Sequence, residues 1–183
     1  EHLRAACEAS LSRLKVEAIG LYQFHRPDPK VPYAESIGAL RDLLDAGKIR
    51  MAGVSNANTD QIRQANEILD GRLVSVQNQF SPSFRSSEGE LVACGELGIA
   101  FLPWSPLGGI GKASGLGEQH SAFDRIASEY DATSQQVTLA WMLAKGPHVI
   151  PIPGSSRPQT IRSSAAAVDL KLSDDDLAAL DAS

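Results

Sequence analysis

The chain has 183 residues, of which 43% are hydrophobic, and a formal net charge of −5 at pH 7. This length can bury one sizeable core, and the composition argues against intrinsic disorder. The negative charge argues against a nucleic-acid-binding surface, and no apolar run reaches the roughly 20 residues of a membrane-spanning helix. With only two cysteines, Cys7 and Cys94, and no visible signal peptide, we expect a reducing, cytoplasmic location.

Helical spacing and short apolar runs alternate along the first half of the chain. In chain order they predict helix 1–14, strand 18–24, helix 33–46, strand 49–54, helix 59–69, strand 73–76, helix 88–97 and strand 99–103. Glycines at 47, 71 and 98 fall at helix ends, where glycine is favoured. Either Asn58 or Thr59 is placed to cap the third helix.

The second half continues the alternation after a glycine-rich loop at 108–117. Two helices are predicted at about 121–130 and 135–145, and the apolar run 149–152 predicts a fifth buried strand. A helix at 158–168 follows. The last helix begins at Ser173, where the sequence has the spacing of a capping box.

Repeated strand–helix units predict an α/β fold with a parallel sheet that is buried on both faces. Five countable strands fit either five consecutive strands of a (β/α)8 TIM barrel or a small doubly wound open sheet. No linker or low-complexity tract interrupts the pattern, so residues 1–183 are expected to form a single domain.

Both architectures carry their chemistry at the carboxyl ends of the strands. In this chain every predicted strand is followed by hydrogen-bonding or flat aromatic side chains. These positions are His25, Ser55 and Asn56, Gln77, Trp104 and Ser105, and the loop 154–157. A purely structural sheet does not need this pattern, which suits a flat heterocycle that bears an amide.

The loop after the fifth predicted strand has the chemistry of a phosphate site. Gly154, Ser155 and Arg157 precede Pro158, and proline is favoured at the first helical position. The loop therefore opens onto a helix N-terminus with unpaired N–H groups, hydroxyls and a guanidinium.

Five runs of the sequence, in order and over nearly the whole chain, resemble the aldo/keto reductase family. They are residues 21–28 (LYQFHRPD), 47–56 (GKIRMAGVSN), 76–82 (VQNQFSP), 98–108 (GIAFLPWSPLG) and 152–158 (IPGSSRP). The resemblance implies a (β/α)8 TIM barrel that reduces aldehydes or ketones with NADPH. It implies that this chain is the C-terminal portion, from the helix before the fourth strand through the eighth strand and the C-terminal helices.

The resemblance assigns roles to the residues at the strand ends. His25 resembles the active-site histidine that orients the substrate carbonyl. Ser55, Asn56 and Gln77 resemble the residues that hold the nicotinamide carboxamide, and Trp104 resembles the aromatic residue that stacks on the ring. The structural alternatives are a histidine that closes a strand, polar caps of strand ends and a buried core tryptophan.

Two loops resemble the parts of the family that bind the phosphates of the cofactor. The loop that resembles the pyrophosphate contact contains Ser105, Leu107 and Gly108. The loop that resembles the site of the adenosine 2′-phosphate contains Gly154, Ser155 and Arg157. A guanidinium offers two parallel, permanently charged hydrogen bonds to a phosphate, which favours NADP over NAD. The alternative for Arg157 is an exposed salt bridge.

The family's proton-donating tyrosine, lysine and aspartate have no counterpart in the chain. Tyr22, Tyr33 and Tyr130 lie in a different context, and His25 alone is a poor substitute for that acid. Carbonyl reduction needs an acid that protonates the alkoxide. We therefore expect the parent protein to be an NADP-dependent oxidoreductase for a small carbonyl substrate, and this chain alone to be nearly inactive.

Two other functions remain open from the sequence. One is a non-catalytic protein that binds a nicotinamide cofactor on the same fold and acts as a sensor or regulatory subunit. The other is a barrel enzyme that uses only the late phosphate loop, such as an aldolase or isomerase, but no lysine sits at a strand end. No His, Cys, Asp and Glu cluster has metal-ligand spacing, so no metal is expected.

Overall fold

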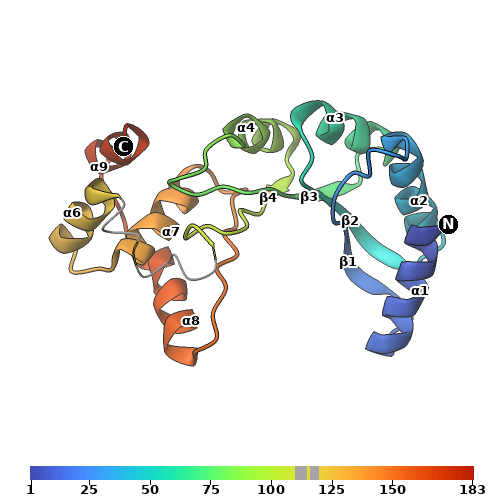
Figure 1. The fold of residues 1–183 in the computed structure, drawn as a ribbon, viewed down its shortest axis with the longest axis horizontal. Helices are drawn as coiled ribbons and strands as arrows, with labels where there is room; N and C mark the ends of the chain where they lie inside the picture. The colour runs from blue at the N-terminus through green and yellow to red at the C-terminus, as the bar shows by residue number, and fades with distance from the viewer. Residues whose placement is uncertain (110–114, 116–119) are drawn as a thin grey trace. The chain divides into compact units, whose positions relative to one another are not determined.

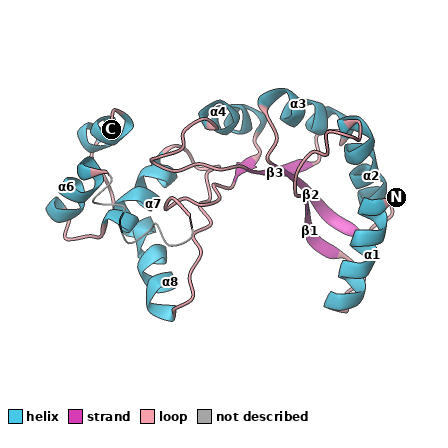
Figure 2. Ribbon diagram, in the orientation of Figure 1, coloured by secondary structure: helices cyan, strands magenta, loops and turns pink. Residues whose placement is uncertain are grey.

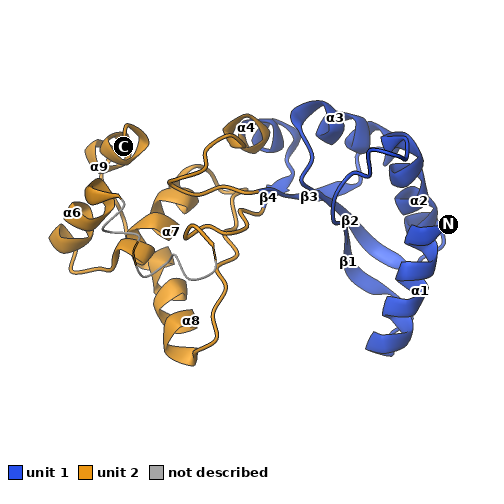
Figure 3. Cartoon of the chain, viewed as in Figure 1, with its two compact units in different colours: residues 1–78, 92–101 blue, residues 79–91, 102–183 orange. Residues whose placement is uncertain are grey.

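The structure, a computed structural model, describes residues 1–109, 115 and 120–183 (Figure 1). Their contacts gather in two compact units, residues 1–78 with 92–101 and residues 79–91 with 102–183 (Figure 3). Most of the predicted glycine-rich loop 108–117 lies outside the described residues. The expectation of a single domain stays a prediction.

The first unit is an α/β unit with a parallel sheet. Its elements are α1 (His2–Leu14), β1 (Ile19–Phe24), α2 (Tyr33–Asp45), β2 (Ile49–Ser55), α3 (Thr59–Ile68), β3 (Leu73–Gln77), the C-terminal part of α4 (Glu88–Leu97) and β4 (Ala100–Phe101). The strand order is β1-β2-β3-β4, and every neighbouring pair is parallel. Figure 2 draws β1, β2 and β3 as magenta arrows. The predicted strand–helix alternation and the parallel pairing are confirmed.

The two faces of this sheet differ in burial. On one face Ala52, Val54 and Val76 are fully buried, and α2 and α3 pack on the strands to which they connect. On the other face Leu21 pairs with Met51, and these side chains are 36% and 44% exposed. Ser75, which alternates with Val76 along β3, is 2% exposed. Within the described part of this unit the second face is therefore exposed at Leu21 and Met51 but buried at Ser75, so the predicted burial on both faces holds only in part.

The start of α3 shows which residue caps it. The side chain of Asn58 accepts a hydrogen bond from the Gln61 N–H at 2.9 Å, and the Gln61 side chain accepts one from the Asn58 N–H at 3.0 Å. This reciprocal pair satisfies two N–H groups that the first turn leaves without helical partners. Asn58 is the cap, and Thr59 is the first helical residue.

The second unit is largely helical. It contains the N-terminal part of α4, α6 (Ser121–Glu129), α7 (Ser134–Ala144), α8 (Pro158–Ala165), the 3₁₀ helix η2 (Ala166–Asp169) and α9 (Asp174–Asp181). At its centre the buried Trp141 stacks on Phe80 at 5.5 Å between ring centroids and meets Phe123 edge to face at 5.7 Å. Ser173 and Asp176 form the predicted capping box of α9.

The predicted fifth strand at 149–152 is wrong. Val149 is buried as expected and forms an isolated β-bridge, but none of these residues lies in a strand, and Ile150 and Ile152 are exposed. Pro151 and Pro153 lack N–H groups and cannot donate to a sheet ladder. The Ile152 N–H does bond the Pro103 carbonyl at 3.2 Å. Similarly, β4 has two residues instead of the predicted 99–103. Within the described residues the fold is therefore α/β with four parallel strands, not five.

A cluster of charged and aromatic side chains holds α9 in the second unit. The Trp141 indole N–H and the Lys145 ammonium both donate to Asp181 Oδ1, each at 2.7 Å. The Arg85 guanidinium donates to the carbonyls of Leu180 and Asp181 at 2.8 and 2.7 Å and lies 4.9 Å from the Trp141 ring centroid.

Among the described residues, none of the helices combines the length and apolar character needed to cross a lipid bilayer.

Candidate functional site

The carboxyl ends of β1, β2 and β3 meet in one hydrogen-bonded cluster. The buried Ser55 hydroxyl donates to the Gln77 carbonyl at 2.5 Å. The Asn56 side-chain amide donates to the His25 carbonyl at 2.8 Å and to Ser55 Oγ at 3.1 Å. The structure thus brings together the four predicted residues His25, Ser55, Asn56 and Gln77, although they come from three different strand ends.

The backbone at Asn56 is in the left-handed region, with φ of 55°. Few residue types adopt this conformation readily, and asparagine is among those that do. The turn brings the Asn56 N–H to the Gln77 carbonyl at 3.1 Å. The conformation explains why asparagine suits this position even apart from any ligand.

Asn78, to which the sequence analysis assigned no role, fixes the backbone of Ala57, the residue after Asn56. Asn78 is 5% exposed, and its Oδ1 accepts from the Ala57 N–H at 3.2 Å while its Nδ2 donates to the Ala57 carbonyl at 2.8 Å. The available signal was a polar residue directly after a buried strand, between two other amides. Its direction toward the backbone of another loop could not be inferred from that pattern.

Some hydrogen-bonding groups of the cluster remain available to bind a ring that bears an amide. No described hydrogen bond uses Asn56 Oδ1 or the side-chain amide of Gln77, and Asn56 is exposed. An amide offers one acceptor and two donors, which these side chains can match from the side that faces solvent. The donor set of this unit therefore fits the carboxamide that the sequence analysis assigned to it.

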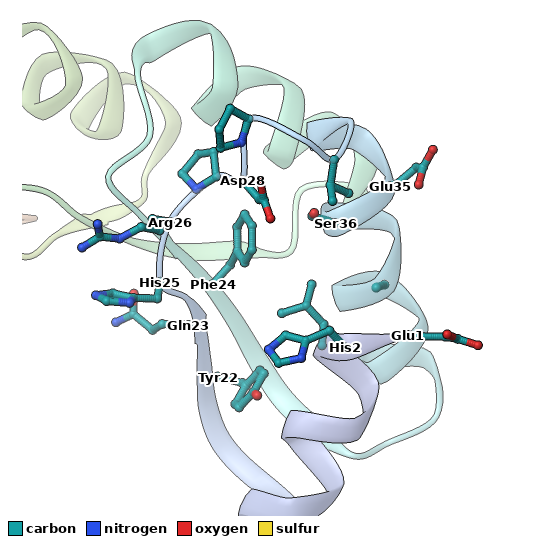
Figure 4. A pocket seen from close by; sticks show the side chains of 15 residues that line it. Glu1, His2, Tyr22, Gln23, Phe24, His25, Arg26, Asp28, Glu35 and Ser36 are labelled. Carbon is teal, nitrogen blue, oxygen red and sulfur yellow. The ribbon is translucent and has the colours of Figure 1, made fainter.

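His25 follows β1 and is exposed. Figure 4 shows its imidazole and the Gln23 side chain on one side of the strand, with Tyr22 and Phe24 on the other. Residues of β1 and of the loop after it line a hollow of about 770 Å³ together with the start of α1 and the first half of α2.

In the second unit, Trp104 lies at the start of a tight loop. It forms a bridge with Gln79, and its indole N–H is buried without a hydrogen-bond partner among the described residues. Ser105 has φ of 52°, and Gly108 has φ of 87° and donates its N–H to the Ser105 carbonyl at 3.0 Å. Leu107 is 9% exposed, so this loop is anchored by its apolar side chain.

The predicted phosphate loop is exposed throughout, from Gly154 to Arg157. Ser155 Oγ donates to the Arg157 carbonyl at 2.9 Å and accepts from the Arg157 N–H at 3.2 Å. Arg157 is the N-cap residue of α8, and Pro158 stands in its first turn. Arg157 makes no ion pair with any described residue, so the alternative of a surface salt bridge finds no support.

The two loops of the second unit are joined at their bases. The bond from the Ile152 N–H to the Pro103 carbonyl links the residues just before Trp104–Gly108 to those just before Gly154–Arg157.

Within the described residues, no group of three His, Cys, Asp or Glu side chains could hold a metal ion.

The three tyrosines are poorly suited to donate a proton. Burial raises the pKa of Tyr33 far above its ordinary range, and its hydroxyl has no partner among the described residues. Burial also raises the pKa of Tyr22. The Tyr130 hydroxyl donates to Asp176 at 2.7 Å. None of the three is held beside His25 as an acid that is easily deprotonated.

Comparison with known proteins gives one consistent result. The model of the aldo/keto reductase family matches residues 1–183. A probable aldo-keto reductase 1 of Glycine max is 36% identical over 97% of this chain and 58% of its own length. The chain therefore spans somewhat more than half of that curated relative.

Two solved structures show the same likeness. A thermostable aldo-keto reductase, Tm1743, in complex with the inhibitor epalrestat has a TM-score of 0.87 and 30% identity, over 98% of this chain and 65% of its own. An aldo/keto reductase from Klebsiella pneumoniae in complex with NADP and acetate has a TM-score of 0.84 and 31% identity, over 98% of this chain and 64% of its own.

Proposed function

Since this chain belongs to the aldo/keto reductase family, we propose that it serves the NADPH-dependent reduction of aldehydes or ketones to alcohols. The observation that carries the proposal is the cluster of His25, Ser55, Asn56 and Gln77 at three strand ends. The structural relative from Klebsiella pneumoniae that holds NADP supports the choice of cofactor.

The first unit is proposed to bind the nicotinamide end of the cofactor. Asn56 Oδ1 would accept from the carboxamide NH₂, and the Gln77 amide and the remaining lone pair of Ser55 Oγ would complete its hydrogen bonds. Asn78 keeps the turn at Asn56 in place by holding Ala57. When bound, NADPH supplies the hydride that reduces the carbonyl carbon.

The second unit is proposed to bind the rest of the cofactor. Trp104 would stack on the nicotinamide ring, and the loop of Ser105, Leu107 and Gly108 would contact the pyrophosphate. Gly154, Ser155 and Arg157 would receive the adenosine 2′-phosphate, because α8 presents unpaired N–H groups and a guanidinium without an ion-pair partner among the described residues. This charge favours NADP over NAD.

His25 is proposed to orient the carbonyl oxygen of the substrate. Its backbone carbonyl is fixed by Asn56 at 2.8 Å, so the imidazole starts from a defined position. The proton for the alkoxide is proposed to come from a tyrosine outside these 183 residues, together with a lysine and an aspartate. The chain would then be the C-terminal part of a TIM barrel, nearly inactive alone, in a cytoplasmic protein.

A second candidate function is a sensor or regulatory protein that binds the cofactor without turnover. The observation in its favour is that Tyr22 and Tyr33 have raised pKa values and Tyr130 is engaged by Asp176. Such a protein needs the binding groups of the strand ends but no acid.

The decisive experiment measures NADPH binding by calorimetry and NADPH oxidation with a panel of small aldehydes and ketones, in the full-length parent protein and in its Asn56→Ala variant. Binding with turnover, both lowered by the substitution, supports the reductase. Binding without turnover on any carbonyl supports the sensor. An absence of NADPH binding by the native protein refutes both.

A further inference from the structure

Trp104, the residue proposed to stack on the nicotinamide ring, is held by the backbone of residues 79–80. Gln79 and Trp104 form a parallel bridge, and the Phe80 N–H donates to the Trp104 carbonyl at 3.4 Å. The Trp104 indole N–H has no hydrogen-bond partner among the described residues. The position of its ring therefore depends on this backbone and on packing, rather than on a hydrogen bond from the ring to a described residue.

The ring of Phe80 is in turn fixed by Trp141 of α7. The two rings stack with 11° between their planes and 5.5 Å between their centroids, and neither side chain is more than 1% exposed. Because protein interiors are close-packed, a buried ring cannot move without displacing its neighbour. The position of Phe80, and with it the backbone that holds Trp104, therefore depends on the position of Trp141.

Arg85 joins the same loop to the end of α9. Its Nε donates to the Pro82 carbonyl at 3.3 Å, and its two terminal nitrogens donate to the carbonyls of Leu180 and Asp181. The carbonyls in the last turn of a helix lack helical partners, and a cation is favoured beside them. The guanidinium also lies over the Trp141 ring. One side chain thus contacts its own loop, the indole against which Phe80 stacks, and the last turn of α9.

We propose that the docking of α9 sets the position of the Trp104 ring, through Trp141 and Phe80. Arg85, Trp141 and Asp181 are then positioning residues for the nicotinamide, since the Asp181 carboxylate accepts the Trp141 indole N–H at 2.7 Å. All of these residues belong to the second unit. The role in cofactor binding rests on the proposed function, whereas the contacts that connect α9 to Trp104 do not.

The binding test is a double-mutant cycle in the full-length parent protein, with the Kd for NADPH measured by calorimetry. Trp141→Leu should weaken NADPH binding roughly three- to thirtyfold, and Trp141→Phe, which keeps a flat ring against Phe80, should recover most of the affinity. In a Trp104→Leu background, Trp141→Leu should have almost no further effect, because the ring that Trp141 positions is absent. Equal weakening in both backgrounds, or native affinity in Trp141→Leu, would overturn the positioning role.

Two further variants separate positioning from a general loss of stability. Ile126→Ala removes a fully buried side chain of α6 that is not part of the stack, so it should lower the free energy of unfolding without changing the Kd for NADPH. Arg85→Lys keeps the charge but not the planar fork that holds two carbonyls, so it should weaken NADPH binding. If Ile126→Ala weakened binding as much as Trp141→Leu, the effect would come from stability and the positioning role would be refuted.

The path of contacts is tested without the cofactor, by NMR of the indole N–H groups. Arg85→Leu leaves both tryptophans of the chain in place and should shift the Trp104 signal, which is assigned by its absence in Trp104→Leu. An unchanged Trp104 signal overturns the proposal. A shifted signal in a parent protein that does not bind NADPH supports the path from α9 to Trp104, and refutes the proposed function together with the role in cofactor binding.

Discussion

Asn78 forms both hydrogen bonds of its side-chain amide with the backbone of one residue, Ala57. The amide oxygen accepts from the Ala57 N–H at 3.2 Å, and the amide nitrogen donates to the Ala57 carbonyl at 2.8 Å. Both residues are buried. The end of β3 thereby holds the turn after β2, where Asn56 has its left-handed conformation.

Removal of this amide should loosen the turn. Asn78→Ala leaves the Ala57 N–H and carbonyl buried without partners, so the free energy of unfolding should fall by about 1–3 kcal/mol. The affinity for NADPH should fall with it, because Asn56 loses its fixed position. Urea unfolding and calorimetry measure the two effects.

Two variants sharpen this test. Asn78→Asp keeps an acceptor for the Ala57 N–H but has no N–H to donate to the Ala57 carbonyl, so it should not restore stability. Gln79→Ala changes the neighbouring amide and should be close to the native protein. An Asn78→Ala variant with native stability would show that the turn is held by other contacts.

Arg157 should decide between the two nicotinamide cofactors. Arg157→Ala should weaken NADPH binding roughly 10- to 100-fold, the effect of losing charge-assisted hydrogen bonds to a phosphate. NADH binding should not change, because NADH lacks the 2′-phosphate. Titration of both cofactors by calorimetry checks this, with Lys171→Ala as a control for a general loss of positive charge. Equal losses for NADPH and NADH would contradict the assignment.

Trp104 should contribute affinity through its ring. Trp104→Leu removes the aromatic face and should weaken NADPH binding by roughly 1–3 kcal/mol, the size of stacking between a base and an aromatic side chain. Trp104→Phe should keep most of the affinity. Calorimetry is the appropriate measurement, because the substitution itself changes the protein's fluorescence. Native affinity in Trp104→Leu would exclude stacking.

The pH dependence of stability should depend in part on Asp181. Burial alone would raise its pKa, but hydrogen bonds from Lys145 and Trp141 outweigh this and lower the pKa below its ordinary value. A carboxylate with a lowered folded-state pKa stabilises the protein above about pH 4 and loses that contribution as the pH falls through the folded-state value. Asp181→Asn should therefore flatten the acid limb of the stability profile.

Urea midpoints at pH 7 and pH 3 measure this effect. The difference between the two midpoints should be smaller in Asp181→Asn than in the native protein. Asp169→Asn, which removes an exposed carboxylate outside the cluster, should keep the native difference. An unchanged difference in Asp181→Asn would mean that other carboxylates control acid unfolding.

Much of the fold was predictable because local signals marked the element ends. The helix at 88–97 has the predicted bounds, and Asn58 was one of two predicted caps for α3. The strand predicted at 149–152 failed for a local reason as well, because Pro151 within it and Pro153 directly after it lack the N–H donors that a sheet ladder needs. The predicted burial failed in part as well, because Val149 is buried whereas Ile150 and Ile152 are 52% and 36% exposed.

The residues at the strand ends were predictable from the sequence, but the side chains that hold those ends in place were not. The strand ends supplied His25, Ser55 and Asn56 because parallel strands end on one edge. The function of Asn78 depends on a side chain that bends back to another loop, which no spacing reveals. The register between β2 and β3 shifts between Ala52 and Gly53, and no periodicity in the sequence indicates that shift.

The exposed part of the sheet carries a methionine whose oxidation can report whether another chain packs there. The chain has two methionines, and Met51 on the open face is 44% exposed, whereas Met142 in α7 is fully buried. Peroxide converts an accessible methionine to its sulfoxide. Any chain that packs on that face will slow the oxidation of Met51, while Met142 serves as the reference within the same molecule.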